Sequence, residues 1–482
     1  MKRVFCVSIL LTAALFAVVG FVSDSAFALA DDVVLDVGAD TPVVMAGEGN
    51  KVIVRVLVKP ERRERESRAP LAVALVLDKS GSMASDGKMK NAKLGALEAL
   101  KMLDPGDVAT VVVYDDSARV AVRARPVGKG DKEPVFSRGI GRIQPSGMTA
   151  LHAGVVLGAK QLEPFVKEGF IPRIVMLSDG VANVGPSTTR ELASLGRKLA
   201  RKEMTITTIG LGLDYNEDLM TALAAESGGN AYFARTSKML RDIFARDMED
   251  AVTLTARKVR VTLRGKGGAR PERALGRVGR IEEDVVEVAI DNLYGSEKYA
   301  LIELELPKGT PGTTLEAAEV LLEYVDPESG EKVVSKSPLT VAFTEDEGEV
   351  EKNRQPEIVS QAALARNAEI REEAIRLADE GKAKEAAMIL SERTQQLRML
   401  APSVGSAAPM MRKESAAFDE LAESLAAEGE FSNEDRKAVL NEAYIQKNQQ
   451  TLVVMDDADD DPLLDDEDID YDEDDDEYDE EE

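Results

Sequence analysis

Residues 71–83, LAVALVLDKSGSM, constrain the fold of this chain more than any other stretch. The seven consecutive apolar residues 71–77 predict a strand that is buried on both faces. Asp78, Ser80 and Ser82 follow at once and place three oxygen-bearing side chains on alternate residues. In an open α/β sheet, ligands bind at the carboxyl ends of the strands. Three such side chains in one tight turn suggest a hard cation that is held by oxygen atoms.

Two later segments carry side chains of the same kind. The sequence PSGMTA at 145–150 puts Thr149 at a predicted junction between a loop and a helix. The sequence IVMLSDG at 174–180 is a second apolar strand, and Asp179 follows it directly. We therefore expect both residues at the same edge of the sheet as Asp78.

The DxSxS pattern, the loop threonine and the strand-end aspartate together resemble the metal-ion-dependent adhesion site of von Willebrand factor type A domains. The resemblance covers residues 68–252 and matches all five positions in order. It implies an α/β doubly wound, mostly parallel sheet. It also implies that the metal ligands are the following: Asp78, Ser80, Ser82, Thr149 and Asp179, with the two carboxylates binding directly or through water.

The resemblance further implies the ion and the kind of partner. Mg²⁺ suits an all-oxygen site that keeps several waters, and Ca²⁺ or Mn²⁺ could replace it. Hydroxyl ligands leave the ion electron-poor, so an open coordination position attracts an Asp or Glu carboxylate of a protein partner. A lone serine at a strand end is otherwise a helix cap, and a lone Asp-Gly is otherwise a turn.

Four neighbouring residues receive weaker interpretations. We expect Lys79 to point to solvent at the rim of the site, where it could favour acidic partners. For Asp115 and Asp116 a turn role is the main interpretation, and a place behind the metal ligands is the alternative. His152 lies one predicted turn past Thr149 and is expected near the site without being a ligand.

Residues 1–30 predict a secretory signal peptide. Lys2 and Arg3 precede an apolar stretch, and small residues at Ala26, Ala28 and Ala30 form a cleavage pattern. An uncleaved membrane anchor is the alternative. No later stretch is apolar enough over a sufficient length to span a bilayer. We therefore predict an exported protein, periplasmic or extracellular at the cell surface, with no stable membrane span after cleavage.

The charge of the chain is concentrated at its C-terminal end. The formal net charge is −28, and residues 456–482 hold 20 acidic side chains and no basic one. Such a composition predicts a disordered acidic tail. It also disfavours nucleic acid as a partner, because polyanions repel each other. The tail could bind Ca²⁺ weakly, meet a basic patch on a partner or within this chain, or simply remain solvated.

The predicted organisation has several parts. Residues 51–59 and 33–35 alternate as half-buried strands, and several further alternating strands follow residue 256. We expect these two groups to form one β-sandwich, with the α/β domain inserted in it. The expected parts are as follows: 1–30 signal peptide, 31–68 N-terminal strands and linker, 69–252 α/β domain, 253–350 β-sandwich, 351–450 helical region and 451–482 disordered tail.

The residue inventory argues against several classes of enzyme. The chain has one histidine and one cysteine, and Cys6 lies inside the predicted signal peptide. Zinc sites and thiol catalysis are thereby excluded from the mature chain, and no P-loop is present. We predict a non-enzymatic, exported, metal-dependent protein-binding protein. The alternative is a structural or assembly factor of the cell envelope that uses the helical region and the tail as its main contacts. The oligomeric state stays open.

Overall fold

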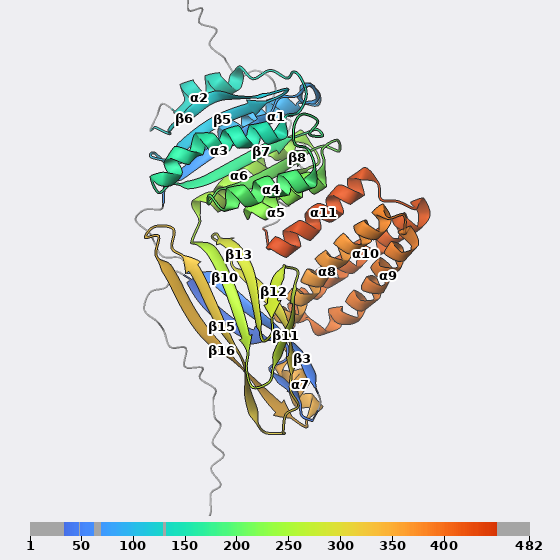
Figure 1. Cartoon of the computed structure of the whole chain (residues 1–482). Coiled ribbons are helices and arrows are strands. Elements are labelled where there is room, and N and C mark those ends of the chain that lie inside the picture. Colours follow the sequence, from blue (N-terminus) through green and yellow to red (C-terminus); the bar gives the residue numbers. More distant parts are fainter. Residues whose placement is uncertain (1–32, 48, 62–68, 129–131, 451–482) are drawn as a thin grey trace, which may run out of the picture. The chain divides into compact units, whose positions relative to one another are not determined.

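The computed structural model describes residues 33–47, 49–61, 69–128 and 132–450, which form three sheets and a helical region (Figure 1). The predicted signal peptide and the predicted acidic tail lie outside these residues. The domain boundaries given above stay a prediction. No helix in the described ranges is both long and apolar enough to cross a membrane.

The first sheet carries the strand predicted from residues 71–77. Its strand order is β6-β5-β4-β7-β8-β9, and all neighbours run parallel except β6, which pairs antiparallel with β5 at one edge. This topology confirms the predicted mostly parallel sheet. The strands are β4 Leu71–Asp78, β5 Val108–Tyr114, β6 Ala118–Pro126, β7 Ile171–Ser178, β8 Thr205–Leu211 and β9 Ala231–Ala234.

Helices cover both faces of this sheet, and the burial of β4 shows why. Every residue of β4 is buried, and its side chains alternate between two cores, Leu75 facing one and Val76 the other. One face carries α1 Lys88–Lys101, α2 Lys132–Gly141 and α6 Leu240–Val252, and the other carries α3 Leu151–Lys167, α4 Thr189–Ala200 and α5 Glu217–Ser227.

The remaining two sheets pack face to face around one apolar core and form a sandwich. Strands from before the α/β sheet contribute to both sheets, since β3 pairs with β14 and β2 pairs with β16. The α/β sheet is therefore inserted between strands of the sandwich. The two sheets are β1 Val33–Ala39, β3 Asn50–Pro60, β14 Lys298–Leu306 and β11 Arg270–Leu275; and β12 Gly279–Glu282, β13 Val285–Leu293, β10 Ala256–Gly265, β15 Thr314–Val325, β16 Lys332–Thr344 and β2 Val43–Met45.

Three of these strands, β11, β12 and β2, were not predicted from the sequence. The β11 segment carries a proline and three charged residues, and β12 is a short exposed strand at a sheet edge. The β2 strand has three residues and pairs with β16 alone. Their strand conformation is fixed by long-range pairing, because none of them shows a long alternating pattern of its own.

The helical region contains α7 Glu347–Asn353, α8 Pro356–Asp379, α9 Ala383–Leu400, α10 Ala408–Glu428 and α11 Asn433–Asn448. Helices α8 and α9 are joined by a tight turn at Gly381, whose φ of +77° is a left-handed conformation that glycine adopts without strain. Ser432 caps the start of α11, where its hydroxyl accepts a hydrogen bond from the Asp435 backbone.

Helix α11 attaches the helical region to the α/β sheet. Arg436 pairs with Glu217 and with Asp218 at the start of α5, the latter at 2.9 Å. The ammonium of Lys437 donates to the Tyr215 carbonyl at 2.8 Å, and the Tyr444 hydroxyl donates to a backbone carbonyl beside β9. These contacts hold α11 along the α5 and β9 side of the sheet.

Candidate metal centre

The five predicted site residues lie at the carboxyl edge of the α/β sheet. Asp78 is the last residue of β4, and Asp179 directly follows β7. These two strands are parallel neighbours in register, so their carboxyl ends lie side by side. Ser80 and Ser82 lie in the turn after β4, where a short 3₁₀ helix spans Gly81–Ala84.

Hydrogen bonds and close approaches join these residues into one cluster. The Ser80 and Ser82 hydroxyl oxygens are 3.0 Å apart, and the Ser82 hydroxyl donates to Asp179 Oδ1 at 2.7 Å. A Cβ atom built on Gly180 would lie 3.5 Å from the Thr149 hydroxyl and 3.6 Å from the Ser82 hydroxyl. The Thr149 loop, which is distant in sequence, therefore reaches the same point as the first turn.

Asp78 is a buried carboxylate that faces only neutral donors. Its side chain is fully buried, Oδ1 accepts from the Ser80 backbone at 2.8 Å, and Oδ2 accepts from the Ser178 hydroxyl at 2.8 Å. No lysine or arginine of the described residues forms an ion pair with it. Burial raises the pKa of Asp78 to about 6, against the hydrogen bonds that favour the charged form.

Asp179 differs because it faces a lysine that the sequence analysis missed. Lys88, the first residue of α1, donates to Asp179 Oδ2 at 2.8 Å, and its side chain is 12% exposed. Nothing in the local sequence distinguishes Lys88 from the other lysines of α1. Only the folding of the helix start over the site reveals its role.

The expectation for Lys79 is wrong. Lys79 is 3% exposed and does not point to solvent. Its ammonium pairs with Asp115 and donates to the Ser146 hydroxyl at 2.6 Å, and the Ser146 backbone donates to the Lys79 carbonyl at 2.6 Å. The lysine thus joins the turn after β4 to the Thr149 loop, and the contact with Lys79 holds the pKa of Asp115 below its usual value although burial opposes this.

Asp116 and Asn183 hold the Thr149 loop in place. Asp116 Oδ1 accepts from the Met148 backbone at 3.1 Å, and Asn183 Oδ1 accepts from the Thr149 backbone at 2.9 Å. Gly147 has a φ of +73°, and a Cβ there would lie 2.7 Å from the Asp116 carboxylate. Asp115 and Asp116 therefore support this loop in addition to forming the turn after β5.

His152 is half-buried on α3, and burial lowers its pKa. Among the described residues it makes no hydrogen bond with any of the five candidate ligands.

Comparisons with known proteins agree with this geometry. Residues 71–233 match the family model described as von Willebrand factor type A domain. The chain contains a von Willebrand factor type A domain. The predicted family is thus confirmed, and the matched residues begin with β4 and end within β9.

Curated relatives share this domain at low identity. The uncharacterized protein sll0103 of Synechocystis is 27% identical over 65% of this chain and 74% of its own length. The uncharacterized protein YfbK of Escherichia coli is 24% identical over 44% of this chain and 37% of its own length. The human inter-alpha-trypsin inhibitor heavy chain H4 is 26% identical, and the match covers 34% of this chain but only 18% of that protein.

Solved structures support the fold beyond the domain itself. A von Willebrand factor type A protein from Catenulispora acidiphila has a TM-score of 0.63 at 18% identity, over 79% of this chain and 89% of that one. The ArnB paralog VWA2 from Sulfolobus acidocaldarius has a TM-score of 0.52 at 20% identity, over 86% and 98%. At these identities the structures bear on the fold alone.

The donor set of the von Willebrand A domain fits a divalent cation of the hard type. The site offers two carboxylates and three hydroxyls, and Mg²⁺ prefers such oxygen ligands together with waters. No cluster of three or more His, Cys, Asp or Glu side chains suited to a metal occurs within the described ranges. Asp78 is fully buried and pairs with no lysine or arginine of the described residues, and this feature most favours an added ion.

A second polar cluster lies near the amino ends of β7 and β8 in the same sheet. The sequence analysis missed it. Asp247 of α6 is fully buried and receives both Nε and Nη2 of Arg173, the Nε at 2.9 Å. The Thr207 hydroxyl donates to Asp247 at 2.7 Å, and Arg173 Nη1 donates to the Tyr294 hydroxyl at 3.0 Å.

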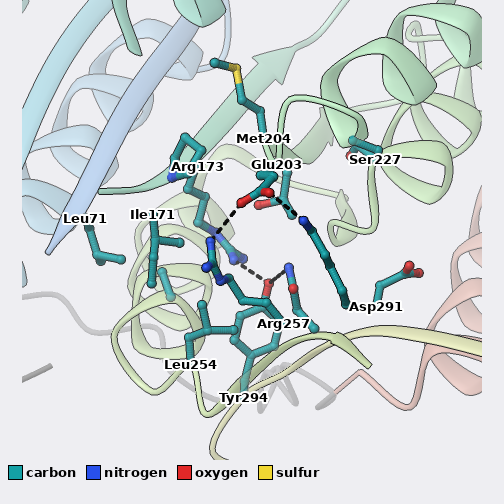
Figure 2. A pocket seen from close by; sticks show the side chains of 16 residues that line it. Leu71, Ile171, Arg173, Glu203, Met204, Ser227, Leu254, Arg257, Asp291 and Tyr294 are labelled. Atoms are coloured by element: carbon teal, nitrogen blue, oxygen red, sulfur yellow. Dashed lines mark hydrogen bonds and ion pairs between the residues drawn. The ribbon is translucent and has the colours of Figure 1, made fainter. Parts of the chain in front are cut away.

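A small cavity of about 90 Å³ adjoins this cluster, and Figure 2 shows its lining side chains. Most of the charged groups there are paired within the chain. Glu203 pairs with Arg257 at 3.0 Å and with Lys258, while Arg173 reaches Tyr294. Because these charges are paired within the chain, we assign this cluster a structural role between α6 and the sandwich.

Proposed function

We propose that this protein binds a protein partner through a divalent cation at the carboxyl edge of its von Willebrand A domain. The ligands in this proposal are Asp78, Ser80, Ser82, Thr149 and Asp179, and the ion is Mg²⁺, with Ca²⁺ or Mn²⁺ as substitutes. The single observation that carries the proposal is Asp78, a fully buried carboxylate that meets neutral donors only. The domain type agrees with it, since von Willebrand A domains commonly take part in protein interactions.

In this proposal, the candidate ligands and the residues around them have different roles. A divalent ion held there would offer Lewis-acid binding to a partner carboxylate. Ser80, Ser82 and Thr149 bring neutral oxygens, so Asp78 and Asp179 are the only formal negative charges among the five proposed ligands. Lys79, through Asp115 and Ser146, fixes the two loops at the spacing that the hydroxyls need.

The surface around the site suits a protein partner. Met148, directly before Thr149, is 52% exposed, and Val181, directly after Gly180, is 54% exposed. Both residues flank candidate ligands at the carboxyl edge. A partner with an Asp or Glu next to apolar residues would bury these side chains while its carboxylate completes the coordination shell. Export to the periplasm or the cell surface belongs to this proposal.

The test is metal-dependent capture. The full chain and an Asp78→Ala/Ser80→Ala variant are immobilised and exposed to cell-envelope extract, with Mg²⁺ or with a chelator. Asp214→Ala is the matched control, because Asp214 is an exposed carboxylate in the loop after β8 at the same edge. A protein retained by the wild type and the control in Mg²⁺ alone supports the proposal. Equal retention by all three proteins with and without metal contradicts it.

An assembly role of the helical region is the second candidate. Met399 at the end of α9 and Met410 at the start of α10 are 74% and 41% exposed, and exposed methionines suit adaptable contacts. Met399→Glu/Met410→Glu is a better test than deletion, because α8 buries Ile358 and Ala362 against the sandwich. Loss of captured proteins in this variant, with retention in Asp78→Ala/Ser80→Ala, would favour the assembly role.

We also propose that the protein is not an enzyme. The candidate site offers oxygen ligands and no base held by a third group in the arrangement of a catalytic triad. Binding rather than turnover is therefore the expected activity.

A further inference from the structure

The outer edge of the von Willebrand A domain carries an open groove lined by arginines. It lies between the edge strand β6 and helix α2, and it contains a volume of about 410 Å³. Two arginines come from the strand and two from the helix or its end: Arg123, Arg125, Arg138 and Arg142. All four are exposed.

The two elements approach closely enough to bring these arginines together. A Cβ on Gly139 would lie 2.3 Å from Cγ2 of Val122, so α2 lies directly on β6 at this glycine. Arg138 neighbours this contact on the helix, and Arg123 neighbours it on the strand. The glycine therefore sets the spacing of the two pairs of charges.

These arginines have no ion-pair partner within the described residues. Charges on an edge strand alone can serve to block pairing with other strands. That purpose does not require Arg138 and Arg142 of α2, which face the same groove from the other side.

We propose that this groove binds the acidic C-terminal segment of the same chain, residues 456–482. Charge complementarity carries the assignment. The segment has 20 carboxylates and no lysine or arginine, in a chain whose net charge is −28. A carboxylate and a guanidinium match in geometry as well as in charge, since the guanidinium can donate two parallel hydrogen bonds.

The segment is long enough to reach the groove. The described chain ends beside β9, where the Gln450 side chain donates to the Ala231 carbonyl at 3.4 Å. β6 is the opposite edge of this sheet, about 24 Å away across five strand spacings of about 4.8 Å. An extended chain covers about 3.3 Å per residue. Residues 451–464 are therefore long enough to bridge this distance around the domain, and residues 465–482 can reach the groove.

The tether favours the segment of the same chain over other anions. Exposed pairs of arginine and carboxylate are individually weak, so a free acidic peptide would bind poorly. A segment joined to the domain acts at an effective concentration on the order of millimolar. The interaction is expected to be reversible and to weaken with salt, because the pairs are open to solvent. It does not depend on a metal ion at Asp78.

Fluorescence energy transfer within the full chain tests this proposal. Cys6→Ser removes the only cysteine, and Gln144→Cys and Glu480→Cys carry the acceptor and the donor. We expect transfer at low salt that falls at least twofold at 1 M NaCl. Charge reversal of the groove, R123E/R125E/R138E/R142E, should lower transfer to the high-salt level already at low salt.

The matched control reverses four exposed charges on α3 and α4 or just beyond α4: K160E/K167E/R190E/R201E. It changes the net charge equally and should retain the transfer. Equal transfer in the groove variant and in this control would overturn the proposal. The salt titration of the unaltered groove stays decisive if a variant does not fold, and transfer insensitive to salt would also overturn it. Transfer that occurs only between separately labelled chains would replace it with contact between copies.

Discussion

Asp78 and Asp247 are both fully buried in the von Willebrand A domain. They lie at opposite ends of the parallel strands of one sheet, and they differ in the groups that donate hydrogen bonds to them. Asp247 receives the guanidinium of Arg173, together with neutral donors from Thr207 and Asn230. Within the described residues, Asp78 accepts from neutral groups such as the Ser80 backbone and the Ser178 hydroxyl, and it forms no ion pair.

This difference distinguishes Asp247, a carboxylate with a structural role, from Asp78, a carboxylate of a candidate metal site. A carboxylate buried without a cation is costly in free energy, and a guanidinium within the chain offsets that cost at Asp247. At Asp78 none of the described residues supplies such a group, although Lys88 supplies one to the neighbouring Asp179. The comparison therefore predicts that an external cation acts at one edge of the sheet and has no effect at the other.

Replacement of Arg173 by methionine should have the largest effect. Arg173→Met leaves Asp247 buried without its cation, and the free energy of unfolding should fall by about 3–5 kcal/mol. Denaturant unfolding should show this loss equally with Mg²⁺ and with a chelator. A loss below about 1 kcal/mol would mean that Asp247 does not need its partner, and the comparison would break.

Asp78→Asn should have a smaller effect that depends on metal. With a chelator, the stability should change by no more than about 1 kcal/mol, because the amide keeps the acceptor for the Ser80 backbone. At about 100 times the dissociation constant, Mg²⁺ should stabilise the wild type by about 2.7 kcal/mol through mass action. The variant should lack this gain. Thermal unfolding with and without Mg²⁺ measures both quantities, and an equal gain in the two proteins would refute the assignment of Asp78.

Lys88→Met should strengthen metal binding. The ammonium of Lys88 competes for Asp179 Oδ2, and a unit charge about 4 Å from a divalent ion costs about 2 kcal/mol in water. Mn²⁺ affinity should therefore rise roughly 30-fold when the charge is removed. Lys101→Met at the far end of α1 is the control and should leave the affinity unchanged. A weaker affinity in Lys88→Met would show that the lysine supports the site instead.

A further prediction concerns Lys298, which lies beside Tyr294 near Arg173. Burial, together with the nearby Arg277, lowers the pKa of Lys298 to about 8. The folded state then releases this proton at a lower pH than the unfolded state, whose lysine pKa is about 10.4. Stability should rise by about 1 kcal/mol per pH unit between about 8 and 10 from this group. Lys298→Met should remove that rise, as pH-dependent denaturant unfolding can measure, and an unchanged slope would contradict it.

The sequence predicted what depends on local pattern. The apolar run before Asp78 was enough to predict the central strand. Ser80 and Ser82 follow it closely in sequence, so their place in the same turn could be predicted as well. Lys79 was misplaced because its partner Asp115 is 36 residues away and becomes a neighbour only through the pairing of β4 with β5.

The same reason explains what the sequence analysis missed entirely. Arg173 and Asp247 are 74 residues apart, and Lys88 and Asp179 are 91 apart. Each residue alone is an ordinary charged residue of a strand or helix. Only the packing of α6 and α1 against the sheet makes them partners, and no periodicity in either segment reports that contact.

The most direct measurement of the central claim is a calorimetric titration of Mg²⁺ into the full chain and into Asp78→Asn. The acidic segment 456–482 is present in both proteins, so any cation binding by this segment contributes equally to both and cancels in the difference. The account predicts one saturable site in the wild type that is absent from the variant. Coinciding isotherms would contradict it and would show that Asp78 is tolerated without a cation.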